Sequence, residues 1–123
     1  MPAVMIANAT VPGLTAIPAS LSPAAIDGLL RKQLGFSGLV ISDSLTAVSI
    51  SASGYSLPVA ALAAIRAGTD EVLFNALPNQ IASYNSAIVN ALVSAVSSKR
   101  LSRLRLVQAA LHAQSAKALI NAC

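Results

Sequence analysis

The chain has 123 residues, of which 55% are hydrophobic, 3% aromatic and 10% charged, and its formal net charge is +4. This length fits one ordinary domain with a sizeable core, and the hydrophobic content excludes a disordered chain. Because alanine is abundant and aromatic residues are scarce, closely packed helices are favoured over a β-sandwich or an aromatic ligand cage.

The charged residues and the single cysteine exclude several kinds of site. The one basic cluster consists of Lys99, Arg100, Arg103 and Arg105. No aromatic residue is interleaved with it, so we interpret it as a solvated helix boundary and expect no nucleic-acid partner. Cys123 stands alone, which excludes an internal disulfide and a cysteine-based metal site. We expect neither a metal nor a cofactor.

Three long stretches lack charge, at residues 1–26, 44–65 and 72–98. The first has no basic leading segment and is interrupted by prolines, unlike a signal peptide. The other two are long enough to cross a bilayer, but serine, asparagine, glutamine, glycine and proline recur in them. We therefore expect no signal peptide and no membrane span. The compartment stays open between the cytoplasm and, with an upstream leader, export.

The chain begins with the pattern of a strand followed by a helix. An apolar run at residues 3–9 has the length and composition of a buried parallel strand. After a loop rich in proline, glycine and threonine, Ser22 and Pro23 predict a helix that runs to Leu34 and ends at Gly35. Its apolar face is expected to carry Ile26, Leu29, Leu30 and Leu34.

The same alternation continues in the middle of the chain. A second strand is predicted at residues 38–42, followed by a polar loop at 44–56 with at most one helical turn. Leu57 and Pro58 open a helix to Ala67, which Gly68 ends. A short third strand is predicted at residues 71–74.

Two further helices complete the predicted elements. One spans residues 79–98, and the other is capped by Ser102 and spans 103–120. The first is expected to bury Ile81, Ile88, Leu92 and Val96, and the second Leu104, Val107, Leu111 and Leu119.

Three repeats of strand, loop and helix fit either a doubly wound open sheet or a piece of a (β/α)8 barrel. A complete barrel needs about 250 residues, so a chain of this length holds roughly half of one.

The four acidic residues differ in their place along these elements. Asp27 lies in the first turns of a helix, where it complements the helix dipole, and Asp70 and Glu71 precede or begin the third strand. Only Asp43 follows a strand, and the carboxyl ends of barrel strands carry catalytic groups. The alternative, that Asp43 caps its own loop by accepting backbone hydrogen bonds, is equally open from position alone.

Four consecutive segments resemble blocks of family 3 glycoside hydrolases. They are PAVMIANA at residues 2–9, PASLSP at 18–23, LLRKQLGFSGLVISDSL at 29–45 and AIRAGTD at 64–70. They follow the family's order and spacing and cover most of residues 2–75. The similarity is greatest to the β-N-acetylglucosaminidase (β-hexosaminidase) branch, whereas the two last helices are similar in pattern only.

This resemblance implies an α/β fold that is a partial (β/α)8 TIM-type barrel. About three βα units would be equivalent to the sixth, seventh and eighth barrel strands, with an extra C-terminal helix. Residues 1–123 would then form a single partial catalytic domain. Its strand-tip loops are expected at 8–22, 43–56 and 75–79, and its C-terminal helix at 103–120.

The resemblance also implies a retaining glycosidase. The family's nucleophile is the aspartate after the seventh strand, and Asp43 takes that place. The residues implied to bind substrate are Asn8, Ser42, Ser44 and Asn75. Backbone N–H groups and the hydroxyls of Ser42 and Ser44 are expected to hold the Asp43 carboxylate by hydrogen bonds, although Ser44 replaces an aspartate common in the family. For Asn8, a role as a loop cap is an equally open alternative.

The catalytic set implied by the resemblance is incomplete in this chain. The histidine-bearing loop that provides the general acid/base in the resembled branch has no counterpart here, and His112, on the last helix, is not expected to be catalytic. We therefore expect little hydrolysis by the isolated chain, which should self-associate or pair with a missing N-terminal barrel half.

The implied substrates are terminal β-linked N-acetylglucosaminides, cell-wall-derived ones among them. The alternative function is a non-catalytic barrel fragment or interaction module. A receiver-like α/β domain is disfavoured, because no acidic pair follows the first strand.

Overall fold

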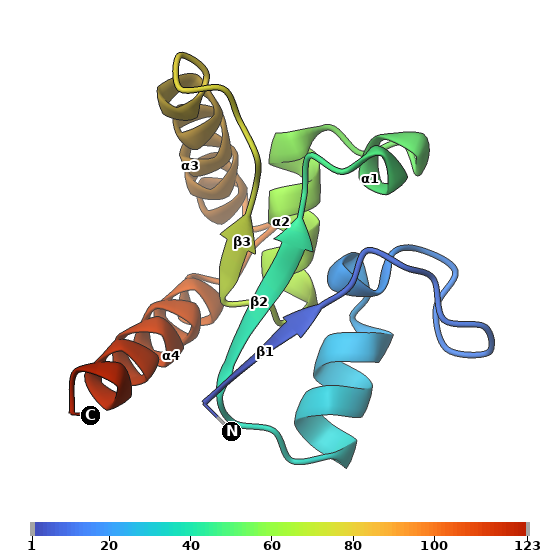
Figure 1. The fold of residues 1–123 in the computed structure, drawn as a ribbon, viewed down its shortest axis with the longest axis vertical. Helices are drawn as coiled ribbons and strands as arrows, with labels where there is room; N and C mark the ends of the chain where they lie inside the picture. Colours follow the sequence, from blue (N-terminus) through green and yellow to red (C-terminus); the bar gives the residue numbers. More distant parts are fainter. Residues whose placement is uncertain (1, 123) are drawn as a thin grey trace.

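The computed structural model describes residues 2–122, with a three-stranded parallel sheet at its centre (Figure 1). The strands β1 (Ala3–Ile6), β2 (Leu39–Ser44) and β3 (Glu71–Leu73) lie in the order β1-β2-β3. Met1 and Cys123, and with them the expectation about the cysteine, lie outside the described residues.

The helical segments alternate with the strands and then complete the chain. They are η1 (Ala19–Leu21), η2 (Ala24–Gln33), α1 (Val48–Ala52), α2 (Leu57–Ala67), α3 (Ile81–Ser97) and α4 (Arg103–Asn121). The strands and long helices predicted from the sequence are thus confirmed, and the single helical turn allowed in the loop after β2 is α1. Two strand ends were predicted wrongly, because β1 ends at Ile6 rather than at residue 9 and β2 continues through Asp43 to Ser44, which were assigned to the loop. Since β1, β2 and β3 are parallel, their carboxyl ends lie at one end of the sheet, where the chain enters η1, α1 and the loop before α3 (Figure 1).

The core is built from aliphatic side chains and alanine. Val40 of β2 packs between Ile26 of η2 and Ala67 of α2, all fully buried. A larger cluster joins η1, α1, α2 and α3 and consists of Leu21, Leu45, Ile50, Ala60, Ala61, Ala64 and Ile88. Alanines on α2 let neighbouring helices approach closely, as the composition predicts.

Helices cover one face of the sheet more completely than the other. Because side chains alternate along a strand, Ile41 and Asp43 lie on the face of β2 opposite to Val40 and Ser42. Met5 of β1 pairs with Ile41 in the ladder and is 56% exposed. Helices therefore pack on the Val40 face, whereas the face that carries Asp43 is partly open.

The helix ends show where local sequence determines structure. Gly68 closes α2 with a left-handed φ of 119°, as predicted. The helix η2 is wound with i to i+5 bonds, for example from Gly28 N–H to the Pro23 carbonyl at 2.9 Å, and is a π-helix rather than an α-helix. Ser102 occupies the N-cap position of α4, but its side chain makes no capping hydrogen bond.

The apolar stripe predicted for α4 is wrong. Its members are exposed: Leu104 by 64%, Val107 by 45%, Leu111 by 54% and Leu119 by 58%. The helix instead buries Ala109 and Ala116, because the side chains of Arg105 and His112 on the same face bind the buried carboxylate of Asp70. Leu34 of η2 and Ile81 of α3 are likewise exposed, at 68% and 50%, although the sequence pattern placed them in the core.

Candidate active site

Asp43 lies next to the carboxyl end of β2 and is half-buried. The N–H of Ser44 donates to Asp43 Oδ1 at 2.7 Å. Within residues 2–122, neither a cation nor a second carboxylate pairs with Asp43, and Oδ2 has no hydrogen-bond partner. The carboxylate is therefore held by one backbone N–H while its second oxygen stays available to a reacting group.

The hydroxyls expected to hold Asp43 make other hydrogen bonds. Ser42 is fully buried, and its Oγ accepts from the N–H of Leu73 at 3.0 Å. Ser44 Oγ lies 3.0 Å from Thr46 Oγ1. The expectation that these two hydroxyls bind Asp43 is thus wrong, because each is used to join β2 to its neighbour or to the loop that follows.

Asn8 follows β1 and is tied into the protein by both ends of its amide. Its Nδ2 donates to the Ser44 carbonyl at 2.6 Å, and its Oδ1 accepts from Ser20 Oγ at 2.5 Å. Asn8 is 9% exposed and Ser20 is fully buried. The side chain thereby links the loop after β1, η1 and the tip of β2.

Thr46 connects two strand-tip loops, a role that sequence reasoning missed. Its Oγ1 donates to the Asn75 carbonyl at 3.1 Å and accepts from the Asn75 N–H at 2.9 Å. Because a hydroxyl has only one proton to donate, Ser44 must be the donor in its contact with Thr46. The side chain of Asn75 is exposed. A threonine two residues past a strand end was the only available signal for this link.

The residues predicted to form the site therefore lie at the same end of the sheet. Asn8, Ser44 and Asn75 are joined to one another by the bonds just described, and Ser42 lies within β2 beside Asp43. Within the described part of the chain, no group of His, Cys, Asp or Glu side chains could hold a metal ion. The arrangement can present one carboxylate to a substrate, but residues 2–122 place no acid or base beside it.

A second charged centre lies at the opposite end of the sheet, around Asp70. Its side chain is fully buried and accepts from Arg31 at 2.6 Å, Arg105 at 2.8 Å, His112 Nδ1 at 3.0 Å and the Val40 N–H at 3.0 Å. Burial acts to raise the pKa of Asp70, but the bonds from Val40, Arg105 and His112 and the charge of Arg31 outweigh it and leave that pKa below its ordinary value. The sequence placed Asp70 at this end but gave no sign of its partners, which are 35 to 39 residues away for the two arginines.

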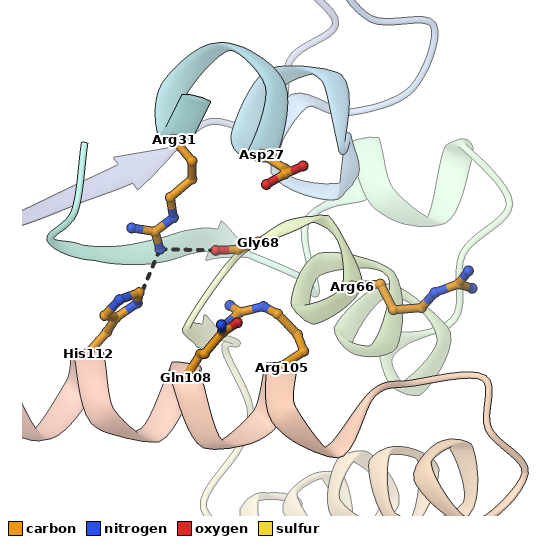
Figure 2. A pocket seen from close by; sticks show the side chains of 7 residues that line it. All are labelled: Asp27, Arg31, Arg66, Gly68, Arg105, Gln108 and His112. Atoms are coloured by element: carbon orange, nitrogen blue, oxygen red, sulfur yellow. Dashed lines mark hydrogen bonds between the residues drawn. The ribbon is translucent and has the colours of Figure 1, made fainter. Parts of the chain in front are cut away.

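The hollow beside this centre is not near Asp43. It has a volume of about 270 Å³ and lies between η2, α2 and α4 (Figure 2). The residues that line it are Asp27, Arg31, Arg66, Gly68, Arg105, Gln108 and His112. Figure 2 shows Arg31 and His112 pointing toward each other and Arg66 pointing away from them. Since Arg31 and Arg105 are paired with Asp70, we assign this hollow to a structural ion-pair cluster, which also accounts for the only histidine.

None of the helices within residues 2–122 has the length and apolar composition needed to cross a bilayer.

Comparisons with known proteins give a consistent family. A family model, the glycosyl hydrolase family 3 N-terminal domain, matches residues 1–116. The structure of a family 3 β-N-acetylglucosaminidase from a Paenibacillus species superposes with a TM-score of 0.85 at 33% identity, over 94% of this chain and 22% of that one. For β-N-acetylhexosaminidase from Beutenbergia cavernae the TM-score is 0.81 at 32% identity, over 95% and 33%.

Curated relatives give the same result over a shorter region. The β-hexosaminidase of Bordetella pertussis is 44% identical over 73 residues, which are 59% of this chain and 20% of that protein. The chain therefore spans about a fifth of the length of the curated relatives it matches.

Proposed function

Since this chain belongs to glycosyl hydrolase family 3, we propose that it carries the nucleophile of a β-N-acetylhexosaminidase. The reaction is the retaining hydrolysis of terminal β-linked N-acetylglucosaminides, with Asp43 as the nucleophile. The names of the relatives support the substrate class, because β-hexosaminidase and β-N-acetylglucosaminidase recur among them.

We further propose that β1, β2 and β3 are equivalent to the sixth, seventh and eighth strands of a (β/α)8 barrel. The parallel order and the partly open face that carries Asp43 support this, because that face would line the inside of a complete barrel. The small share of each relative that the chain covers also supports it. The remaining strands would then come from outside this sequence.

The observation that carries the proposal is the state of the Asp43 carboxylate. One oxygen is fixed by the Ser44 N–H, and the other is neither ion-paired nor hydrogen-bonded within the described residues. An ionised carboxylate held in this way can attack the anomeric carbon and form a glycosyl-enzyme, which water then hydrolyses. A carboxylate buried in ion pairs, such as Asp70, cannot do so.

The general acid/base must come from outside residues 2–122. Acid-assisted departure of the leaving group needs a second proton-carrying group across the glycosidic bond. Asp70 and His112 are bound to each other at the far end of the sheet, and Asp27 pairs with Lys32 on η2. The exposed loop at Asn75 remains a candidate for contact with the sugar.

Trapping the glycosyl-enzyme tests the nucleophile separately from the general acid. A 2-deoxy-2-fluoro glycosyl fluoride loses fluoride without a proton donor, and its C2 fluorine slows hydrolysis of the adduct. With the upstream half of a family 3 barrel supplied, we expect intact-mass and peptide-mapping spectrometry to find the adduct on Asp43. Asp43→Asn should give none, whereas Asp27→Asn should label like the parent.

The same experiment decides between the two function classes. The absence of an acid/base beside Asp43 within residues 2–122 is what favours a non-catalytic barrel fragment or interaction module. If no adduct forms on Asp43 even in the completed barrel, that second candidate is supported and the glycosidase proposal fails.

A further inference from the structure

We propose that Asn8 is a positioning residue that holds the nucleophile in place, rather than a group that binds the sugar. The inference rests on the proposed role of Asp43. It concerns how the tip of β2 keeps its shape at the point where regular strand pairing ends.

The orientation of the Asn8 amide is determined by its two partners. The Ser44 carbonyl can only accept a hydrogen bond, so the group that faces it at 2.6 Å must be the NH₂ of Asn8. The amide oxygen then accepts a hydrogen bond from Ser20 Oγ at 2.5 Å. The two bonds are thus consistent with a single orientation of the amide. Because both polar atoms are bonded and only 9% of the residue is exposed, little of the side chain is accessible to a ligand.

The Asn8 side chain bonds β2 just beyond the point where the β1–β2 ladder ends. The last paired residues are Ile6 and Ser42, and two residues further along each strand stand Asn8 and Ser44. Beyond these residues the chain turns away from β2 toward η1. The Asn8 side chain supplies a donor at this point, so the Ser44 carbonyl stays paired.

The other neighbour of β2 is also irregular at this point. The register between β2 and β3 shifts between Ile41 and Ser44, and pairing resumes with the Leu45 N–H on the Leu73 carbonyl at 2.8 Å. Such irregularities redirect side chains near active sites and leave peptides without regular partners. The 44–45 peptide is therefore held from two sides, by β3 through its N–H and by the Asn8 side chain through its carbonyl.

The residue that Asn8 holds also holds Asp43. The Ser44 N–H, in the 43–44 peptide, donates to Asp43 Oδ1 at 2.7 Å, while the Ser44 carbonyl, in the 44–45 peptide, accepts from Asn8. Loss of the Asn8 bond leaves the 44–45 peptide held only by the Leu45 N–H on the Leu73 carbonyl, so residue 44 gains freedom to rotate and the carboxylate can leave its attacking position. Because displacement by about 1 Å can cost about 100-fold in rate, the effect should appear in the chemical step.

The test measures how fast the fluorinated glycosyl fluoride labels Asp43 in the completed barrel, as a function of reagent concentration. This separates the limiting rate constant of labelling from the concentration at half-saturation. For Asn8→Ala we expect the limiting rate constant to fall about 10- to 100-fold, with half-saturation changed less than about twofold. Asn90→Ala, on the exposed side of α3, is the matched control and should label like the parent.

Two more variants distinguish hydrogen bonding from packing. Asn8→Asp keeps the shape of the side chain but places an acceptor against the Ser44 carbonyl, so it should label at least as slowly as Asn8→Ala. Ser20→Ala removes only the donor to Asn8 Oδ1, so it should slow labelling a few-fold and lower the melting temperature by several degrees while the protein stays folded. If the Asn8 variants do not fold, the labelling rate of Ser20→Ala tests the positioning role of Asn8 instead.

The outcomes separate this inference from the proposed function. If the Asp43→Asn variant is labelled, Asp43 is not the nucleophile and the proposed function itself fails. Parental labelling rates in Asn8→Asp and Ser20→Ala would overturn the positioning role while leaving Asp43 as the nucleophile. A raised half-saturation with an unchanged limiting rate constant in Asn8→Ala would show that Asn8 binds the sugar, which also overturns it.

Discussion

Asp70 is the residue whose replacement should cost the most stability. Its carboxylate neutralises Arg31 and Arg105, which are only 15% and 16% exposed in their side chains. In Asp70→Asn the new amide N–H groups would face these guanidinium donors and leave two buried cations unpaired. We expect the free energy of unfolding to fall by about 3–5 kcal/mol, measured by urea denaturation.

Asp27→Asn is the matched control for Asp70→Asn. Asp27 also pairs with a cation, Lys32, but their side chains are 50% and 72% exposed. Solvent screening leaves such a pair worth about 0.5 kcal/mol or less. If the two variants lose similar stability, the Asp70 cluster does not hold the fold together as we infer.

The pH dependence of stability should reveal the same carboxylate. The pKa of Asp70 lies below its ordinary value of 3.8 in the folded protein. A group whose pKa is lowered on folding stabilises the protein above its ordinary pKa, and this stabilisation is lost as the pH falls through the lowered value. The difference in unfolding free energy between the parent and Asp70→Asn should therefore shrink as the pH falls below about 4. Urea titrations at each pH check this, and a difference that stays undiminished down to pH 2 would contradict it.

At the scale of elements, α2 ends at a residue where only glycine fits. Gly68 has a φ of 119°, and a Cβ there would lie 2.8 Å from Ile26 Cγ2 on η2. Gly68→Ala should therefore destabilise the protein by about 2–5 kcal/mol, from backbone strain and displacement of η2 together. Thermal and urea unfolding measure the loss.

Gly54→Ala isolates the backbone part of that cost. Gly54 also has a positive φ, 85°, but a Cβ there would meet nothing within 4 Å. We expect it to lose about 1–2 kcal/mol. Equal losses in the two alanine variants would show that contact with Ile26 does not limit the junction of α2 and η2.

The helix α4 shows where prediction from the sequence failed and why. Its leucines and valine repeat at helical spacing, so they predict the buried face. The inward face is instead Arg105, Ala109, His112 and Ala116, at spacings of four, three and four residues, which are equally helical. Arg105 and His112 make that face look polar in the sequence, although both point inward because they bind Asp70, which is 35 residues from Arg105 along the chain. An ion pair between residues so far apart cannot be predicted from the local sequence pattern.

Strand tips were better predicted, because their signal is local. An apolar run followed by a polar residue places Asn8 and Asp43 at the carboxyl ends of parallel strands, and that position requires no knowledge of distant contacts. The hydrogen bonds of these residues were not predictable, since they depend on where β1 leaves the ladder and on the register shift of β3. Sequence thus predicts which residues gather at the site, and tertiary geometry decides what each one does there.

At the scale of the whole molecule, the sheet has a strand at each edge with one unpaired side. β1 and β3 each pair only with β2 in the described chain, and Met5 and Leu73 on these strands are 56% and 41% exposed. Unpaired edges and exposed apolar faces favour association with further strands. The chain alone should therefore form oligomers whose mass rises with concentration, measured by size-exclusion chromatography with light scattering.

We expect the open face of the sheet to drive this association, and exposed apolar side chains elsewhere on the surface not to. Met5→Lys places a charge beside Ile41 on the open face and should shift the distribution toward monomer. Val48→Lys, on α1, changes a side chain that is 80% exposed and should not. Adding the upstream half of a family 3 barrel should replace the oligomers by a one-to-one complex, because the missing strands would cover the same edges and face. A parent chain that stays monomeric at all concentrations would show that these edges are protected without further strands, and the partial-barrel proposal would then lose its physical basis.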